Sequence, residues 1–212
     1  MIANKKELSL YIQADRIMNG YPRKKGVAEI IQNWINIIFG AGVTGGGKLM
    51  IINYLELMRK YSFYLHQKGF LNKIKRFRYG SKFKKFGLKL GFSIGADVFG
   101  YGLVIPHYGT IVVGEPNHIG NYAVLHTSTC ISAKDSEIGD GLYLSTGVKI
   151  TQQVKLGKGI MIGANSVVNK SFDDNQLIVG VPAKSIGLRP IWYENESIFY
   201  ERVKKIEQLK QI

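Results

Sequence analysis

The feature of this sequence that most restricts its fold is a six-residue period in the second half of the chain. The repeating aliphatic positions are Ile119, Leu125, Ile131, Ile138, Leu144, Ile150, Leu156, Ile162 and Val168, with one extra residue inserted between Ile131 and Ile138. Four residues after each position from Ile138 to Ile162 comes a second apolar or small residue: Leu142, Val148, Val154, Ile160 and Ser166. An α-helix repeats every 3.6 residues and an alternating strand every two, so neither produces this pattern.

A parallel β-helix explains the period, because short strands joined by tight turns point one aliphatic side chain per face inward. Three six-residue faces make an 18-residue coil, and glycines follow several repeat positions, where a corner needs a small residue. The segment from about Ile94 to Ser185 resembles the left-handed β-helix of hexapeptide-repeat acyltransferases. Its ending, "IGANSVVNKSFDDNQLIVGVPAKSIG", resembles the last coil and exit loop of that superfamily.

The first half of the chain predicts helices at 4–20, 26–39, 48–67 and 70–88, with Asn4 capping the first and Glu7 as its partner. A last helix is expected at 192–210. We expect the apolar helix faces to pack on each other and on neighbouring subunits. The predicted fold is mainly β with α. It has a basic α-helical domain at 1–90, a left-handed β-helix acyltransferase domain at 91–187 and a C-terminal helical extension at 188–212.

The charge is concentrated in the first half. Residues 1–90 hold 18 Lys and Arg against 4 Asp and Glu, whereas residues 91–212 hold 11 of each. Segment 68–89 contains nine basic residues and no acidic residue. Such a segment attracts anionic surfaces, although a solvated basic face explains it equally well. We expect peripheral contact with an anionic membrane here, and no nucleic-acid partner, because no nucleic-acid fold signature is present.

Other segments limit the class of protein. No uncharged apolar stretch is long enough to span a membrane, and the N-terminus becomes polar too early for a signal peptide. Cys130 is the only cysteine, so we expect a cytoplasmic protein, with contact at the inner membrane face. Gly42 to Leu49 spells G-x-x-x-x-G-K, but Leu49 replaces the hydroxyl residue that holds magnesium in a phosphate loop. A flexible linker is the better interpretation.

His107 is unusual because it stands between a proline and a glycine within an aliphatic run. The segment "IPHYGTIVVGE" resembles the catalytic coil of serine acetyltransferases and of related polysaccharide O-acetyltransferases. In those enzymes a histidine, followed two residues later by glycine and then by I-V-V, is the general base. The resemblance implies that His107 takes the proton from an acceptor hydroxyl. An imidazole suits this role because it titrates near neutral pH.

Four further residues are candidates for binding or orienting the acceptor. His126 lies 19 residues after His107, one more than a coil, so a local bulge places the two on adjacent coils. Tyr108 neighbours the proposed base, and Glu115 and Asp135 carry carboxylates that orient either the imidazole or the acceptor. His118, in the turn "EPNHIG", is better explained as a structural residue.

The resemblance also implies acetyl-CoA as the donor, bound in a groove between two subunits. Backbone groups around Gly147, Gly163 and Ala164 would meet the pantetheine arm, and Lys170 and Lys184 would face the phosphates. It implies a homotrimer or, through the helical half, a hexamer, and it implies no metal.

Two differences from the serine enzymes decide which acceptor we predict. The acid that precedes their base is replaced by Pro106, and the second histidine of their longer loop is replaced by Asp135. We therefore expect an O-acetyltransferase acting on a hydroxyl of a sugar or surface-polysaccharide precursor. The alternatives are a serine O-acetyltransferase and a non-catalytic β-helix scaffold. A β-helical zinc lyase needs three converging histidines, and the spacings of 11 and 8 do not match that arrangement.

Overall fold

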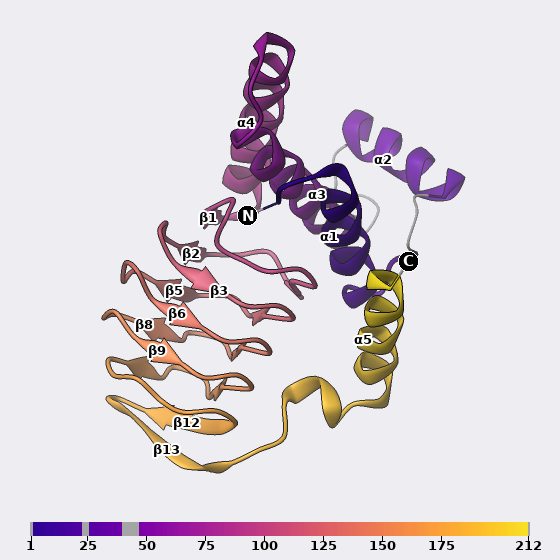
Figure 1. The fold of residues 1–212 in the computed structure, drawn as a ribbon. Helices are drawn as coiled ribbons and strands as arrows, with labels where there is room; N and C mark the ends of the chain where they lie inside the picture. The colour runs from indigo at the N-terminus through magenta and orange to yellow at the C-terminus, as the bar shows by residue number, and fades with distance from the viewer. Residues whose placement is uncertain (1, 23–25, 40–46, 212) are drawn as a thin grey trace.

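A computed structural model describes residues 2–22, 26–39 and 47–211 of the chain (Figure 1). Within these residues, four α-helices precede a stack of short strands, and a fifth α-helix follows it. The helices are α1 (Lys5–Met18), α2 (Val27–Phe39), α3 (Gly47–Leu65), α4 (Phe70–Leu90) and α5 (Ser197–Lys210), with a 3-10 turn η2 (Trp192–Glu194). The strands are β1 (Phe92–Ile94), β2 (Ile111–Val113), β3 (His118–Ile119), β4 (Val124–Leu125), β5 (Thr129–Ile131), β6 (Glu137–Ile138), β7 (Tyr143–Leu144), β8 (Lys149–Ile150), β9 (Lys155–Leu156), β10 (Met161–Ile162), β11 (Val167–Val168), β12 (Gln176–Gly180) and β13 (Ala183–Leu188).

The strands form a parallel β-helix with three faces. One face is β1-β2-β5-β8-β11, the second is β3-β6-β9, and the third is β4-β7-β10-β12 with β13 at its edge. Successive coils are in register, as in the pairing of Cys130 with Lys149 and of Ile131 with Ile150. The fold-class prediction is confirmed.

The six-residue period corresponds to the inward positions of the coils. Every repeat aliphatic from Ile119 to Val168 is at most 4% exposed. Close packing of branched side chains between coils leaves little room for size changes at these positions. The inserted residue lies between β5 and β6, where Asp135 adopts a positive φ of 56°. It widens one turn, but Ile131 still stacks on Ile150 and Ile138 still stacks on Ile119.

The predicted helices are confirmed to within a few residues. Asn4 caps α1 as expected, since its side chain accepts from the N–H of Glu7 at 2.9 Å. Residues 40–46, which hold most of the predicted linker, lie outside the described residues, and Gly47 already begins α3. The expected packing of the helix faces holds for α3 but not within the chain for α2, where Ile30, Ile31 and Trp34 are exposed.

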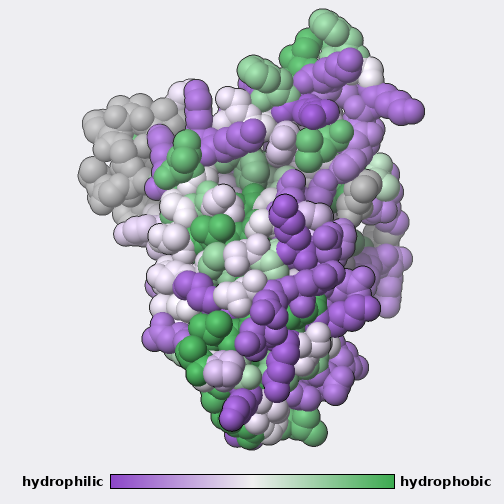
Figure 2. Space-filling model, turned by 90° about the vertical axis from the view of Figure 1, so that its left-hand side faces the viewer, coloured by the Kyte–Doolittle hydropathy of each residue, from purple (hydrophilic) through white to green (hydrophobic). Residues whose placement is uncertain are grey.

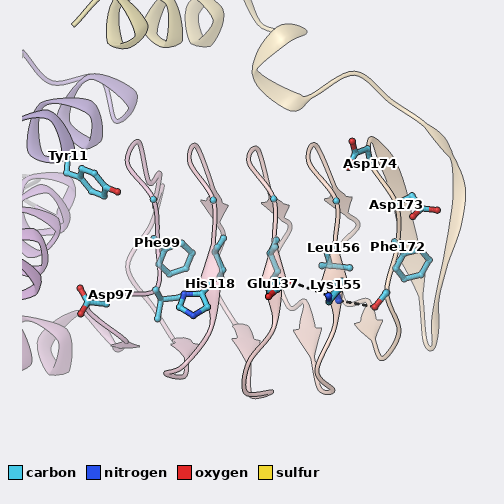
Figure 3. Close-up of a pocket in the computed structure, with 18 residues that line it drawn as sticks. Tyr11, Asp97, Phe99, His118, Glu137, Lys155, Leu156, Phe172, Asp173 and Asp174 are labelled. Carbon is cyan, nitrogen blue, oxygen red and sulfur yellow. Dashed lines mark hydrogen bonds and ion pairs between the residues drawn. The ribbon is translucent and has the colours of Figure 1, made fainter. Parts of the chain in front are cut away.

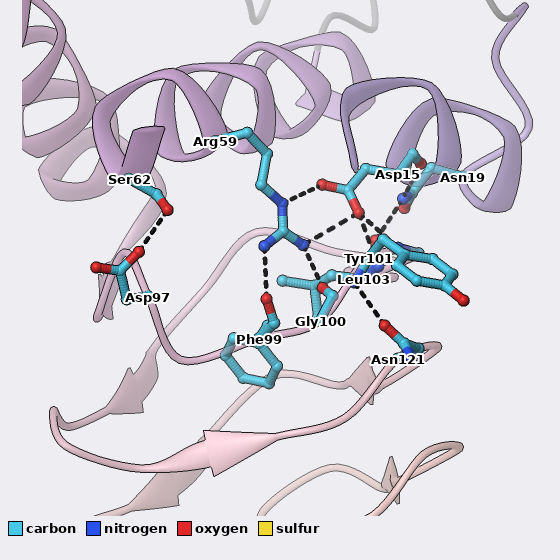
Figure 4. A network of polar contacts seen from close by, with 11 residues as sticks. Asp15, Asn19, Arg59, Ser62, Asp97, Phe99, Gly100, Tyr101, Leu103 and Asn121 are labelled. Carbon is cyan, nitrogen blue, oxygen red and sulfur yellow. Dashed lines mark hydrogen bonds and ion pairs between the residues drawn. The ribbon is translucent and has the colours of Figure 1, made fainter. Parts of the chain in front are cut away.

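A buried ion pair fixes the helices on the first coil (Figure 4). Arg59 of α3 donates from Nε to Asp15 of α1 at 2.7 Å, and both side chains are almost fully buried. Arg59 also donates to the carbonyls of Phe99 and Gly100 at 2.7 and 2.6 Å. Asp15 accepts from the N–H groups of Gly102 and Leu103 at 2.8 and 2.9 Å. Two helices and the chain segment that leads to His107 therefore share one polar network.

The C-terminal segment returns along the solenoid. After the antiparallel β12–β13 hairpin the chain runs back so that α5 lies beside α1 (Figure 1). The expected helix at 192–210 begins only at Ser197, because Trp192 is buried and donates to the carbonyl of Tyr122 at 3.1 Å. Glu207 anchors α5 by accepting from the hydroxyl of Tyr122 at 2.6 Å. Within the described residues, no helix is long and apolar enough to cross a bilayer.

Candidate functional site

His107 lies at a corner of the β-helix, where the chain passes from the β4 face to the β2 face. Before this corner Val104 pairs with Val124, 20 residues on. After it Ile111 pairs with Thr129, 18 residues on. The corner that holds His107 therefore contains two more residues than the corner of the next coil. A bulge is present, with two extra residues where the sequence predicted one, and His107 is exposed on it.

His126 occupies the same corner on the next coil. Its Nε2 lies 2.9 Å from the hydroxyl of Tyr143, which stands one coil further on. Burial lowers the pKa of His126, and the nearby charge of His107 lowers that pKa further. Burial raises the pKa of Tyr143. The tyrosine hydroxyl can donate to the neutral imidazole, the form of His126 that the lowered pKa favours, and this contact positions the His126 ring.

A pocket of about 260 Å³ opens beside His107, between the β-helix corner and three helices. It has two cationic side chains, Lys48 at the start of α3 and Arg202 on α5, whose Nη1 donates to the carbonyl of Met18 at 2.8 Å. Burial lowers the pKa of Arg202, so an anion beside its guanidinium would replace solvation lost on burial. The lining residues are Met18, Asn19, Tyr21, Lys48, Ile51, Ile52, Val104, Ile105, Pro106, His107, Phe199 and Arg202.

Asn19 and Tyr108 shape the surroundings of His107. The side chain of Asn19 donates to the carbonyl of Leu103 at 2.8 Å and accepts from the N–H of Ile105 at 3.3 Å. It therefore fixes the strand that leads into the corner. Tyr108 is exposed, and its ring lies against the first residue of α3, where a Cβ on Gly47 would stand 3.0 Å from it.

Glu115 and Asp135 lie at a different corner of the same chain, between the β2 and β3 faces. Glu115 accepts from the N–H of Ala96 at 2.9 Å, which closes the turn after β1. Asp135 donates through its backbone N–H to the carbonyl of Pro116 at 2.6 Å. Within one chain the structure does not bring either carboxylate to His107.

Three donor-site candidates share the corner of His107 on later coils. Gly147 lies between β7 and β8, and Gly163 and Ala164 lie between β10 and β11. The N–H groups of Gly147 and Gly163 donate within the β-helix, to the carbonyls of Thr127 and Ile178 at 3.0 and 2.9 Å. These two N–H groups are therefore already paired, and the side chains of Asn165 and Val179 fill the space where a Cβ of each glycine would stand.

The two candidate lysines are separated from each other. Lys184 lies on β13, opposite Val179 in the hairpin that extends the β4-β7-β10 face. Lys170 follows β11 at the corner of Glu115 and Asp135, with its ammonium 5.4 Å from the ring centre of Phe172.

His118 lies on the β3-β6-β9 face (Figure 3), whereas His107 lies at the corner between the other two faces. Its outward neighbours across the coils are Glu137 and Lys155, and together they line a groove of about 760 Å³. Among the described residues, no group of three His, Cys, Asp or Glu side chains has the geometry to hold a metal ion.

The sequence analysis missed Tyr143, Asn19, Lys48 and Arg202. Tyr143 was detectable, because it precedes the inward Leu144 and stands one coil after the residues next to His126. The other three come from α1, α3 and α5. Their approach to the corner depends on tertiary packing that has no sequence period.

Comparison of the sequence with those of known proteins identifies relatives that are serine acetyltransferases. No protein-family model matches the chain. The chain is 31% identical over 144 residues to serine acetyltransferase 4 of Arabidopsis thaliana, a match spanning 58% of this chain and 40% of the relative. It is 30% identical over 104 residues to the serine acetyltransferase of Mycobacterium tuberculosis, spanning 46% and 43%. The chain thus spans less than half the length of these two relatives.

Solved structures agree on the fold. The serine acetyltransferase of Brucella abortus aligns with a TM-score of 0.55 at 18% identity, over 86% of this chain and 69% of that structure. A serine acetyltransferase in complex with CoA aligns with a TM-score of 0.51 at 20% identity, over 84% and 85%. These two relatives in sequence are serine acetyltransferases, and the chain shares its fold with the solved serine acetyltransferases.

Proposed function

We propose that this chain is an acetyl-CoA-dependent O-acetyltransferase in which His107 is the general base. The observation that carries the proposal is the enlarged corner. It exposes His107 beside a pocket and sets it one coil from His126, which the Tyr143 hydroxyl holds. The sequence relatives, named serine acetyltransferases, support the same reaction class.

In this reaction His107 first takes up a proton and then gives it back. His107 accepts the proton of the acceptor hydroxyl while that oxygen bonds to the thioester carbonyl carbon. The resulting tetrahedral intermediate then breaks its carbon–sulfur bond, and the imidazolium returns the proton to the departing thiolate. A positioned base of this kind accelerates such a step by about 10²–10⁴-fold. The rest of the acceleration comes from holding donor and acceptor together.

His126 and Tyr143 position the acceptor. Because the pKa of His126 is lowered, its ring stays neutral at neutral pH and adds no positive charge beside the base. A neutral His126 therefore supplies a polar contact to the acceptor hydroxyl without repelling the imidazolium that forms on His107.

The donor follows the corner of His107 along later coils. The pantetheine arm would pass Gly147, Gly163 and Ala164 at this corner, and Lys184 on the hairpin would face the phosphates. One solved structure with this fold is a complex with CoA, which supports the same ligand here.

Serine is the acceptor that the comparisons favour, whereas the sequence alone favoured a sugar hydroxyl. The names of the relatives support serine, and so does the pocket at His107, where Lys48 and Arg202 suit a carboxylate. A glycan remains the second candidate. Pro106 and Asp135 stand where the serine enzymes carry an acid and a histidine.

A homotrimer is the proposed assembly, and the helical half would extend it to a hexamer. Open faces of a β-helix can pack around a threefold axis. Glu115, Asp135 and Lys170 lie at a second corner, on different coils, and would approach the site of His107 only where a neighbouring subunit packs that corner against it. Light scattering of the purified chain tests this assembly directly.

The test of the proposal is acetyl transfer to a panel of acceptors. Thiol release from acetyl-CoA is followed with serine, nucleotide sugars and lipid-linked saccharides, and each product is identified by mass spectrometry. We expect acetylated serine, lost in His107→Ala. Acetylated glycan alone would return the acceptor to the second candidate. No transfer to any acceptor would refute the enzyme and favour a scaffold.

A further inference from the structure

The outer half of α4 exposes a stripe of large apolar side chains. Phe70, Leu71 and Phe77 are 76%, 70% and 79% exposed, and Ile74 is 49% exposed. Phe70, Ile74 and Phe77 stand at i, i+4 and i+7, which places them on one side of the helix. Within the described residues they pack against no core cluster. Large apolar surfaces of this kind mark an interaction site.

The same helix carries only positive formal charge. Segment 68–89 has nine basic residues and no acid, and a hollow of about 540 Å³ opens between α3 and α4. Three of the side chains around the hollow, Lys73, Arg76 and Lys84, are cations, and Phe77 of the apolar stripe lines it too. The remaining lining residues are Tyr61, Gly80 and Ser81, so no acidic side chain contributes.

The outer half of α4 is not covered by other parts of the described chain. The C-terminal end of α4 leads directly into β1, so the Phe70 end is directed away from the β-helix, opposite the β12–β13 hairpin (Figure 1). Figure 2 shows hydrophobic and hydrophilic side chains next to each other at this end of the molecule. Within the described residues no helix is long and apolar enough to cross a bilayer, so contact of α4 with a membrane would be at its surface.

We propose that the outer half of α4 docks on the surface of an anionic lipid bilayer. Phe70, Leu71, Ile74 and Phe77 enter the boundary of the acyl chains, and Lys73, Arg76 and Lys84 hold a lipid phosphate in the hollow. The inference goes beyond the proposed acetyl transfer and does not depend on it.

Charge and polarity favour a bilayer over two other occupants. A second copy of α4 would set eight basic residues against eight, and like charges at short distance repel. A nucleic acid would pair with the cations, but its backbone offers no apolar partner to Leu71 and Ile74. An anionic bilayer satisfies both kinds of side chain at once.

The experiment is sedimentation of the full chain with lipid vesicles. Vesicles of phosphatidylcholine alone are compared with vesicles that also contain phosphatidylglycerol. We expect binding only to the second kind, weakened by added salt because the exposed charges are screened. The variant Lys73→Gln/Arg76→Gln/Lys84→Gln should weaken binding by about five-fold per charge removed, roughly 100-fold in all.

A matched control separates this surface from overall charge. Lys134→Gln/Lys155→Gln/Lys158→Gln removes the same charge from exposed positions on the β-helix and should bind as the wild type does. Phe77→Ser should weaken binding by about tenfold without a change in charge. Circular dichroism confirms that each variant is folded.

Four results would overturn the proposal. The wild type does not sediment with anionic vesicles, or the control variant loses as much binding as the α4 variant. Phe77→Ser binds like the wild type, or the α4 variants change the oligomeric state by light scattering while vesicle binding is unchanged. Binding of a single-stranded oligonucleotide by the wild type, lost in the α4 variants with no vesicle binding, would assign the surface to nucleic acid instead.

Discussion

Replacing Arg59 by methionine tests whether the buried network holds the helical half on the β-helix. Arg59 and Asp15 are 1% and 2% exposed at their side chains. Methionine fills part of the space of the arginine stem but donates no hydrogen bond. The Asp15 carboxylate would lose its countercharge, and the carbonyls of Phe99 and Gly100 would lose their donors.

The expected loss follows from breaking a buried pair by removing one partner. Such changes cost about 3–5 kcal/mol, because an uncompensated charge is left inside the protein. A second variant, Asp15→Asn/Arg59→Met, removes that charge, while the amide oxygen still accepts from the N–H groups of Gly102 and Leu103. It should therefore recover part of the lost stability.

Urea unfolding at a fixed protein concentration measures both effects, since assembly makes stability depend on concentration. Lys60→Met is the matched control. Lys60 is the next residue of α3 and pairs with Glu56 at 2.6 Å, but it is 31% exposed. Because exposed pairs contribute little, its loss should stay below about 1 kcal/mol. An Arg59→Met loss as small as that of the control would refute the reasoning.

The loss in Arg59→Met should also depend on pH. Burial raises the pKa of Asp15, and the charge of Arg59 opposes that rise. Without Arg59 the pKa rises further, so the folded state binds a proton in a pH range where the unfolded state has released it. Stability then falls as pH increases through that range. The deficit of the variant should therefore be larger at pH 8 than at pH 5, and an equal deficit at both would contradict this account.

Three further predictions concern the corner of the candidate site. By NMR titration, His126 should have a pKa below the ordinary histidine value of about 6.5, and it should rise in His107→Ala, which removes a like charge. Because the pKa of His126 is lowered in the folded state, the free energy of unfolding should decrease as pH falls from the ordinary histidine pKa to the lowered pKa. An unchanged pKa of His126 in His107→Ala would show that the two rings do not interact. Gly147→Ala should reduce the free energy of unfolding by roughly 1–3 kcal/mol and so lower the midpoint of thermal unfolding. The reason is that φ is 81° and the new Cβ would stand 2.0 Å from Oδ1 of Asn165. An unchanged midpoint would contradict this prediction. Arg202→Gln should raise the KM for an anionic acceptor by about tenfold and leave the KM for acetyl-CoA unchanged, and equal changes in both would argue against an acceptor pocket.

The β-helix was predictable because its core repeats. Each inward position from Ile119 to Val168 sits on a rigid six-residue step, so one-dimensional spacing is enough to identify the fold. The insertion at Asp135 and the bulge near His107 were also visible, as single departures from that step.

The surroundings of His107 were predictable only where they belong to the repeat. His126 follows from coil spacing, whereas Lys48, Arg202 and Asn19 reach the corner through the packing of separate helices. The resemblance to the serine enzymes also grouped Glu115 and Asp135 with His107, because each stands at a position matched to a residue of that family. The three-sided coil separates them, since a few residues are enough to pass from one corner to the next.

The most direct test of the central claim compares two histidine variants. The kcat/KM for thiol release from acetyl-CoA, with the preferred acceptor, is measured for wild type, His107→Ala and His118→Ala. His118 is an exposed histidine on another face and serves as the control. We expect His107→Ala to lose about 10²–10⁴-fold and His118→Ala to stay close to wild type. Equal activity of His107→Ala and wild type would contradict the claim that His107 is the base.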